Sequence, residues 1–271
     1  MLVCACGAHQ SDPSVPQERP ITGGKFPTAA PFVAPGEHMS YRLQLGEMEL
    51  AAVDVAVGDV TEVAGKQTIA VQLHAKGLGL VKMVTNIDDT LTSWIDLTTG
   101  RPLLWTVDEY AVRGNDRERT EARLHARDGD TIPIEFHLND DPPKPEPQKV
   151  SMPDVWDFAA FYMVLRTWEA PPGSIVDSEV LRSRFLWHVQ MKIHGKEKLV
   201  TELGEFPALR LDGISYKLGR DGKRIRDVDE RHFSIWISDD ADRVPLQCAA
   251  RTDYGDIKLR LVDYQPGARR K

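Results

Sequence analysis

The feature that most constrains the fold is an alternation of apolar and polar residues, with a period of two, that recurs along most of the chain. The clearest run is Phe185–Ile193, in which every second residue is large and apolar. Successive side chains of a strand point to opposite faces, so this run predicts a strand with one face in a core. The same alternation marks the sets Met39 to Leu45, Val53 to Val57, Ile69 to Ala75, Ala122 to Ala126, Ile132 to Leu138 and Ile257 to Leu261.

One segment, at about residues 153–169, has a different pattern. Ser151 to Asp154 can cap the start of a helix, and Pro171-Pro172-Gly173 would stop it. Between them, apolar residues cover most of the helix circumference, which indicates burial. We therefore predict an all-β fold: a large, strongly curved, mainly antiparallel sheet or open β-barrel with one long buried helix.

Proline-rich stretches divide the chain. Residues 1–34 are poor in large apolar side chains and predict a leader remnant followed by a flexible tether. A single β-rich domain is expected at 35–267, interrupted by a stiff, exposed break at 139–149 and followed by a basic tail at 268–271.

The N-terminus carries a candidate lipidation site. Val3-Cys4-Ala5-Cys6 resembles the end of a bacterial lipoprotein signal, although the charged and apolar leader is missing. We expect that translation begins upstream or that the leader was removed, and that Cys6 receives the lipid. The alternative is a chance cysteine pair near a cytosolic N-terminus.

Composition and motifs argue against several kinds of function. A net charge of −7 opposes binding to nucleic-acid phosphates, and no apolar run approaches the roughly 18 residues of a membrane-spanning helix. The sequence lacks the usual catalytic and dinucleotide-binding signatures, so we expect no catalytic residues, no cofactor and no metal. His188 and His194 share a face but would lie roughly 20 Å apart along one strand.

The remaining reactive groups have simpler interpretations. Cys248 falls on the apolar side of its strand, which favours a buried structural thiol over a catalytic one. The pairs Asp88-Asp89 and Asp239-Asp240 are adjacent in sequence and so would point to opposite faces of a strand. We expect turn roles for them, with Asp side chains of the 239–243 loop accepting bonds from neighbouring backbone amides.

The aromatic residues suggest a ligand site. If the sheet curves around the helix, some of them could line a cavity for an acyl chain, because ligand sites are concave and mostly apolar. The alternative is a filled core. The candidate lining residues are Trp105, Phe136, Tyr162, Phe185 and Trp187.

A family resemblance rests on segments spread along the chain. They are Pro35 to Tyr41, Phe161-Tyr162, Leu165-Arg166-Thr167, Pro172-Gly173, Gly204 to Ala208, Ile235 to Asp240, Arg243-Val244-Pro245 and Tyr254-Gly255. In these segments the chain, from roughly Pro35 to Gln265, resembles the domain of unknown function 3108 family of exported bacterial proteins. The resemblance implies an exported, β-rich fold and brings no catalytic residues with it.

Together these features favour a non-enzymatic lipoprotein of the bacterial cell envelope. We expect it in the periplasm, held at a membrane, in our interpretation the outer membrane, by its N-terminal lipid alone. Its ligand would be a lipid or another amphiphile. The alternatives are an envelope scaffold that binds a partner protein and a hydrolase assembled from distant strands. A large apolar cavity would favour the first, an exposed apolar patch the second, and a buried polar cluster with perturbed pKa values the third.

Overall fold

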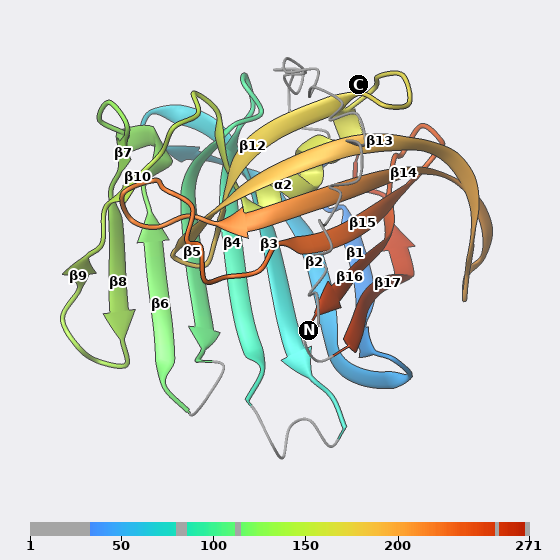
Figure 1. The fold of residues 1–271 in the computed structure, drawn as a ribbon, viewed down its shortest axis with the longest axis horizontal. Coiled ribbons are helices and arrows are strands. Elements are labelled where there is room, and N and C mark those ends of the chain that lie inside the picture. The colour runs from blue at the N-terminus through green and yellow to red at the C-terminus, as the bar shows by residue number, and fades with distance from the viewer. Residues whose placement is uncertain (1–32, 80–85, 112–114, 253–254, 269–271) are drawn as a thin grey trace, which may run out of the picture.

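The fold is dominated by one large sheet (Figure 1). A computed structural model describes residues 33–79, 86–111, 115–252 and 255–268. The sheet has 15 strands in the order β11-β12-β13-β14-β15-β16-β17-β1-β2-β3-β4-β5-β6-β8-β9. All neighbours are antiparallel except β11 and β12, which are parallel. The predicted all-β, mainly antiparallel class is confirmed.

The first half of the chain supplies one arm of the sheet. Its strands are β1 His38–Leu45, β2 Met48–Val63, β3 Lys66–Gly77, β4 Asp88–Asp96, β5 Pro102–Tyr110, β6 Arg117–Ala122, β8 Ile134–Leu138 and β9 Lys144–Pro145. The second half supplies β11 Val155–Asp157, β12 Ile175–Arg182, β13 Phe185–Thr201, β14 Gly204–Lys217, β15 Arg231–Ser238, β16 Pro245–Thr252 and β17 Gly255–Gln265. The two halves join where β17 pairs with β1.

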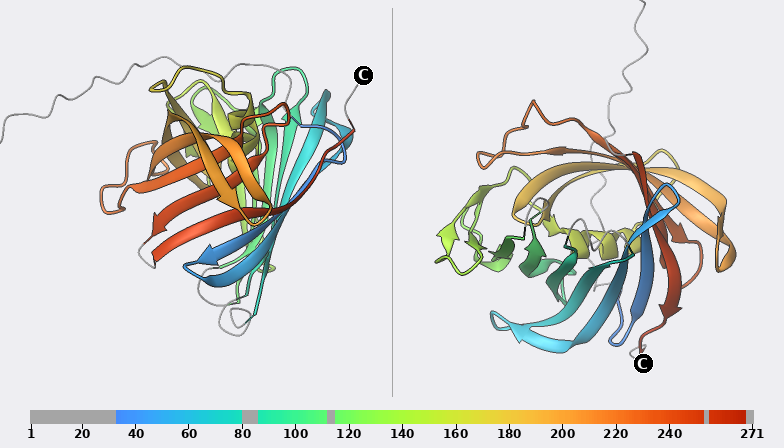
Figure 2. Two further views of the ribbon diagram at one scale, coloured as in Figure 1. Left: turned by 90° about the vertical axis from the view of Figure 1, so that its right-hand side faces the viewer. Right: turned by 90° about the horizontal axis from the view of Figure 1, so that it is seen from below.

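The sheet curls around a short helix, α2 Phe158–Val164, which lies inside the curve (Figure 2). The turn η2 Leu165–Thr167 extends this helix, and its residues from Ala159 to Leu165 are all buried. A buried helix was predicted, but its length of residues 153–169 is wrong. Val155–Asp157 pairs with β12 as a strand, and the Asp157 side chain caps the helix by accepting a bond from the Ala160 amide at 2.8 Å.

Strand alternation sorts the side chains into an inner and an outer face. On β14, Leu209 and Leu211 are buried in the core, whereas Arg210 and Asp212 between them point to the outer face. The inner face packs on the helix and forms the core. One local prediction is wrong: Leu124–Ala126 forms a 3₁₀ turn rather than a strand. The strand β12 was not predicted from its sequence.

The two ends of the curled sheet meet at a seam near the proline-rich break. Glu146, just after β9, accepts bonds from Arg184 at 2.8 Å and from Arg220. The short strand β10 Gln148–Lys149 pairs with β7 Thr131–Ile132, and Gln148 also donates to the Gly219 carbonyl at 2.8 Å. The break is therefore a bridge between the two arms of the sheet.

Candidate functional site

A buried ion pair fastens the helix to the sheet. The Arg166 guanidinium, at the end of the helix, binds the Glu37 carboxylate through two bonds of 2.7 and 3.1 Å. Both side chains are nearly inaccessible, at 2% and 3% exposure. The Tyr264 hydroxyl on β17 donates to the same carboxylate at 3.2 Å, so the helix, β1 and β17 meet at this point.

A second arginine, Arg243, exchanges hydrogen bonds with Arg166. Arg166 donates through Nε to the Arg243 carbonyl at 3.1 Å, and Arg243 donates through Nε to the Arg166 carbonyl at 3.0 Å. Arg243 also donates to the Trp168 carbonyl at 3.0 Å, and Arg166 to the Asp242 carbonyl at 2.7 Å. Buried charges are tolerated when they are paired and hydrogen-bonded in this way. We call Glu37, Arg166, Arg243 and Tyr264 the arginine cluster.

Other ionisable groups of the core have strongly perturbed pKa values. Burial raises the pKa of Asp157 to about 7, although bonds from the Ala160 amide and the Ser93 hydroxyl lower it. Burial also raises the pKa of Tyr41 and of Tyr162 well above their ordinary value. Tyr41 donates to the Pro245 carbonyl at 2.9 Å, whereas the Tyr162 hydroxyl next to it meets hydrogen-bond geometry with no described residue.

These buried groups form a structural centre. Asp157 and Tyr41 are both 0% exposed, so no substrate can reach them without opening the core. Their perturbed pKa values follow from burial and local bonds, which structural networks produce as readily as active sites do. The perturbed pKa values of Asp157 and Tyr41 therefore give no support to a hydrolase.

The aromatic residues proposed as a cavity lining are spread over the inner face. Trp105 is fully buried and its indole donates to the Ser183 carbonyl at 3.1 Å, and Tyr162 lies in the helix beside Tyr41. Trp187 on β13 packs partly buried against the core. The structure thus places these three against neighbouring side chains and backbone.

The other two aromatic candidates lie at the seam. The Arg184 guanidinium sits 3.8 Å from the ring centroid of Phe136 and 5.0 Å from that of Phe185. The Lys217 ammonium lies 3.3 Å from the Phe185 ring. Cation–π contacts of this kind stabilise a charge over an aromatic face. Phe136 and Phe185 hold the seam closed in this structure.

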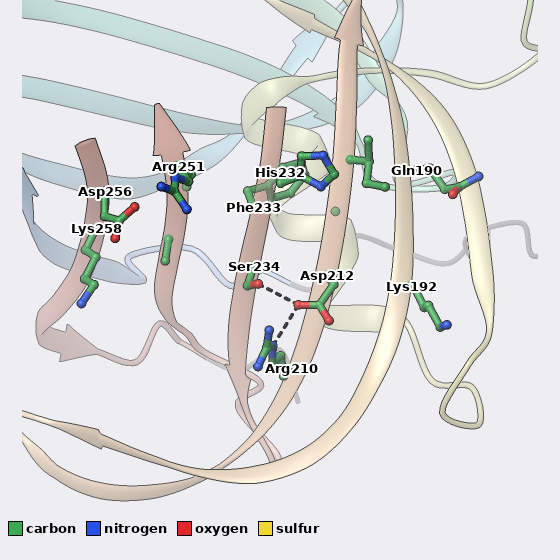
Figure 3. Close-up of a pocket in the computed structure, with 14 residues that line it drawn as sticks. Gln190, Lys192, Arg210, Asp212, His232, Phe233, Ser234, Arg251, Asp256 and Lys258 are labelled. Carbon is green, nitrogen blue, oxygen red and sulfur yellow. Dashed lines mark hydrogen bonds and ion pairs between the residues drawn. The ribbon is translucent and has the colours of Figure 1, made fainter. Parts of the chain in front are cut away.

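An open pocket of about 460 Å³ lies on the outer face of strands β13 to β17 (Figure 3). We call it the outer-face pocket. Its lining residues are Gln190, Lys192, Arg210, Asp212, Gly213, Ile214, His232, Phe233, Ser234, Ala249, Ala250, Arg251, Asp256 and Lys258.

Strand register arranges the pocket in rows. One row runs across five strands through Lys192, Asp212, Ser234, Ala249 and Lys258. The neighbouring row contains Gln190, Ile214, His232, Arg251 and Asp256.

Small residues are part of the pocket lining. Ala249 adds little bulk to the outer face, whereas Gly213 is at an inner-facing position of β14. On the inner face the Phe233 ring lies over Gly213, where an added Cβ would come within 2.2 Å of it.

The acidic side of the pocket is well bonded. Asp212 accepts from Ser234 at 2.7 Å, from Arg210 at 2.9 Å and from His194 at 3.0 Å. Burial alone would raise the pKa of Asp212, but these bonds lower it overall, so the carboxylate is ionised at neutral pH. Arg210 also lies over the Trp236 ring, whose indole donates to Glu197.

The remaining sequence expectations for reactive groups can now be placed. His188 pairs with Asp177 at 3.0 Å and His194 with Asp212, so each histidine has its own carboxylate. Cys248 packs against the core, and although part of the residue is accessible, burial raises the pKa of its thiol to about 12. The thiol is therefore protonated at neutral pH, as a structural residue would be.

The acidic pairs serve turns and ion pairs. Asp240 accepts from the Ser238 hydroxyl and from the Asp242 and Arg243 amides, which confirms the expected turn role. Asp88 pairs with His74 at 2.8 Å, while Asp89 accepts from the Tyr110 amide. In the described ranges no group of three or more His, Cys, Asp or Glu residues could hold a metal ion, and no helix is long and apolar enough to cross a membrane.

Sequence reasoning missed both the arginine cluster and the outer-face pocket as sites. Arg166 and Glu37 are 129 positions apart, and Arg166 and Arg243 are 77 apart, so no local pattern pairs them. The pocket residues follow the ordinary polar alternation of an outer face. The available signal was a set of basic residues on that face, at Lys192, Arg251 and Lys258.

Comparison with known proteins identifies the family. Residues 40–262 match the family described as "Protein of unknown function (DUF3108)", and the chain belongs to it. No curated protein matches the sequence. This is the family that the sequence segments resemble, so that assignment is confirmed.

Solved structures give the fold a parallel. A β-barrel-like protein of domain of unknown function DUF1849 from Brucella abortus has 9% identity and a TM-score of 0.53, covering 87% of this chain and 100% of its own. A candidate exported protein with a YmcC-like fold from Bacteroides fragilis has 4% identity and a TM-score of 0.39, covering 88% of this chain and 99% of its own. At these identities only the Brucella protein supports the fold, and neither bears on function.

Proposed function

We propose that this member of the family is a non-enzymatic lipoprotein of the bacterial cell envelope that binds an amphiphilic molecule in the outer-face pocket. The observation that carries the proposal is the pocket itself. Its volume of about 460 Å³ lies within the roughly 300–1,000 Å³ usual for small-molecule sites. It combines charged side chains with an exposed apolar residue, Ile214, as an amphiphile requires.

The pocket replaces the interior as the place where a ligand would bind. The core between sheet and helix is filled with large side chains, including Trp105, Met163 and Leu165, each nearly or fully buried. The protein groups around Trp105 and Trp187 support a ligand site elsewhere. A ligand on the outer face needs no rearrangement of this core.

Anchoring is the second part of the proposal. The lipid would be attached at Cys6, in the periplasm and at the outer membrane, and residues 7–34 would serve as the tether. Residues 1–32 lie outside the described ranges, so support comes from the sequence Val3-Cys4-Ala5-Cys6. A mass spectrum of the native N-terminal peptide tests it: a diacylglycerol on Cys6 supports the anchor, and an unmodified Cys6 contradicts it.

The scaffold alternative has less support. The exposed large apolar residues belong to different elements: Met48 to β2, Phe158 to α2, Val200 to β13, Leu203 to a turn and Ile214 to β14. Such scattered residues are normal on a protein surface.

The test of ligand binding compares matched variants purified gently from native membranes. Ala249→Trp fills the floor of the pocket, and Ala56→Trp places the same side chain at an exposed position of β2 outside it. We expect solvent extracts of the wild type and of Ala56→Trp to contain one amphiphile at near-stoichiometric level, and extracts of Ala249→Trp to lack it. An empty wild-type extract, or full retention by Ala249→Trp, would refute the proposal.

A further inference from the structure

The outer-face pocket has an excess of positive charge. Four of its lining residues are cationic, Lys192, Arg210, Arg251 and Lys258, against two carboxylates, Asp212 and Asp256. The chain as a whole carries a net charge of −7, so this local balance runs opposite to that of the protein. A concave site of one sign concentrates ligands of the other sign.

The cations in the pocket differ in how they are neutralised. Arg210 is bonded to Asp212 at 2.9 Å. The side chains of Lys192, Arg251 and Lys258 form no hydrogen bond or ion pair with any residue that the structure describes. Three cationic side chains are therefore available to bind a ligand.

The register brings two of these cations within reach of one group. Arg251 is directly opposite Asp256 across the β16–β17 ladder, and Lys258 lies two residues further along the same face. Diagonal cross-strand neighbours have Cα atoms about 7–8 Å apart, a gap that Lys and Arg side chains span together. A single anion can therefore accept from both.

A third observation points to the same end of the pocket. Arg260 follows Lys258 on the outer face of β17 and lies directly opposite Arg42 on β1. Arg42 is 3.9 Å from Glu49, with both side chains at least a third exposed. Arg260 therefore adds positive charge next to Lys258 at this side of the pocket.

We infer that the outer-face pocket recognises its ligand through a phosphate-type anionic group held between Arg251 and Lys258. Ile214, in the same row as Arg251, contacts the apolar part of the ligand. This inference deepens the proposed function and rests on it for the amphiphilic nature of the ligand. Guanidinium and ammonium groups are the usual partners of phosphate oxygens in proteins.

The experiment uses soluble short-chain lipids with identical tails, kept below their micelle concentration and measured by calorimetry with the full chain. Dihexanoylphosphatidylglycerol has a net anionic headgroup, and dihexanoylphosphatidylcholine a zwitterionic one. We expect the anionic lipid to bind about tenfold more tightly, which corresponds to one charge-assisted hydrogen bond. Inorganic phosphate and phosphatidylglycerol vesicles are the two further probes.

Charge variants predict both the sign and the size of the change in affinity for the anionic lipid. Arg251→Gln and Lys258→Gln should each weaken binding of the anionic lipid about tenfold, whereas Asp256→Asn should strengthen it. Lys76→Gln is the matched control, an exposed lysine on the outer face of β3. All four are surface changes, and circular dichroism checks that each variant is folded.

The outcomes separate the inference from the proposed function. Equal binding of both lipids, unchanged in the variants, would overturn the inference and leave amphiphile binding intact. Inorganic phosphate binding as tightly as the anionic lipid would support the anion site and overturn the amphiphile. Binding to vesicles alone, without binding to either soluble lipid, would overturn both in favour of attraction to a charged surface.

Discussion

Breaking the buried pair of Glu37 and Arg166 should cost far more stability than breaking an equally short pair at the surface. Arg166→Met would leave the Glu37 carboxylate buried, with Tyr264 as its remaining donor. Glu37→Leu would leave the Arg166 guanidinium buried without its Glu37 carboxylate, still donating to the Asp242 and Arg243 carbonyls. Removing one partner of a buried pair costs about 3–5 kcal/mol, so we expect each variant to lose that much free energy of unfolding.

The double variant Glu37→Leu/Arg166→Met should lose less than the sum of the two single variants. It removes both charges together and leaves the Asp242 and Arg243 carbonyls without their guanidinium donor, at about 1–3 kcal/mol each. We therefore expect a total loss of about 2–6 kcal/mol, against about 6–10 for the sum. The difference is the coupling free energy of the pair.

Urea unfolding followed by tryptophan fluorescence measures these free energies. The control is the pair Lys198 and Glu205, which has the same 2.7 Å separation but side chains 77% and 54% exposed. Lys198→Met/Glu205→Leu and its single variants should each change stability by less than about 1 kcal/mol. If the losses at Glu37 and Arg166 add within about 0.5 kcal/mol, the reasoning is wrong, because uncoupled sites behave in that way.

Two further variants test buried Asp157 in the core and the contact of Gly213 with Phe233 on the inner face of the sheet. Burial raises the pKa of Asp157 from 3.8 to about 7, so its contribution to stability is complete below pH 3.8 and is lost as the pH rises through 7. Asp157→Asn should abolish that loss, so the wild type should weaken relative to the variant by about 4 kcal/mol between pH 4 and pH 8, and parallel pH profiles would contradict this. Gly213→Ala should destabilise by about 1–3 kcal/mol in thermal melts because its Cβ would collide with Phe233, and adding Phe233→Leu should recover part of the loss. Equal stability of Gly213→Ala and the wild type would count against that contact.

Much of the sheet could be predicted because its strands have one face in the core and one outside. That rule fails where both faces are buried. In β12, Ser178 and Glu179 are buried as well as their apolar neighbours, and Glu179 accepts bonds from Ser151 and Met152. The sequence of β12 therefore lacks the alternation that would reveal a strand.

The helix boundary failed for a related reason. Apolar residues before Asp157 suit a buried strand as well as a buried helix, and only the pairing of Val155–Asp157 with β12 decides between them. The Asp157 cap then fixes where the helix begins. A cap is a local signal, but Ser151 and Asp154 offered competing ones.

The candidate site was harder to predict from the sequence than the fold. The outer-face pocket is lined by residues of five strands, and the alternation within one strand does not show which strands become neighbours. Its basic residues look like any solvated face until the register places Arg251 and Lys258 together. The aromatic residues were conspicuous in the sequence because they form the core and the seam.

The segments through which the chain resembles its family converge on the arginine cluster. Glu37 comes from the opening segment, Arg166 from the helix segment, and Arg243 from the segment before β16, and all three meet in one buried network. These segments therefore specify how the helix is fastened inside the sheet. The outer-face pocket lies on the other side of that sheet, where changing Lys192, Arg251 or Lys258 leaves the cluster untouched. The fastening of the helix and the proposed ligand site therefore lie on opposite faces of the same sheet.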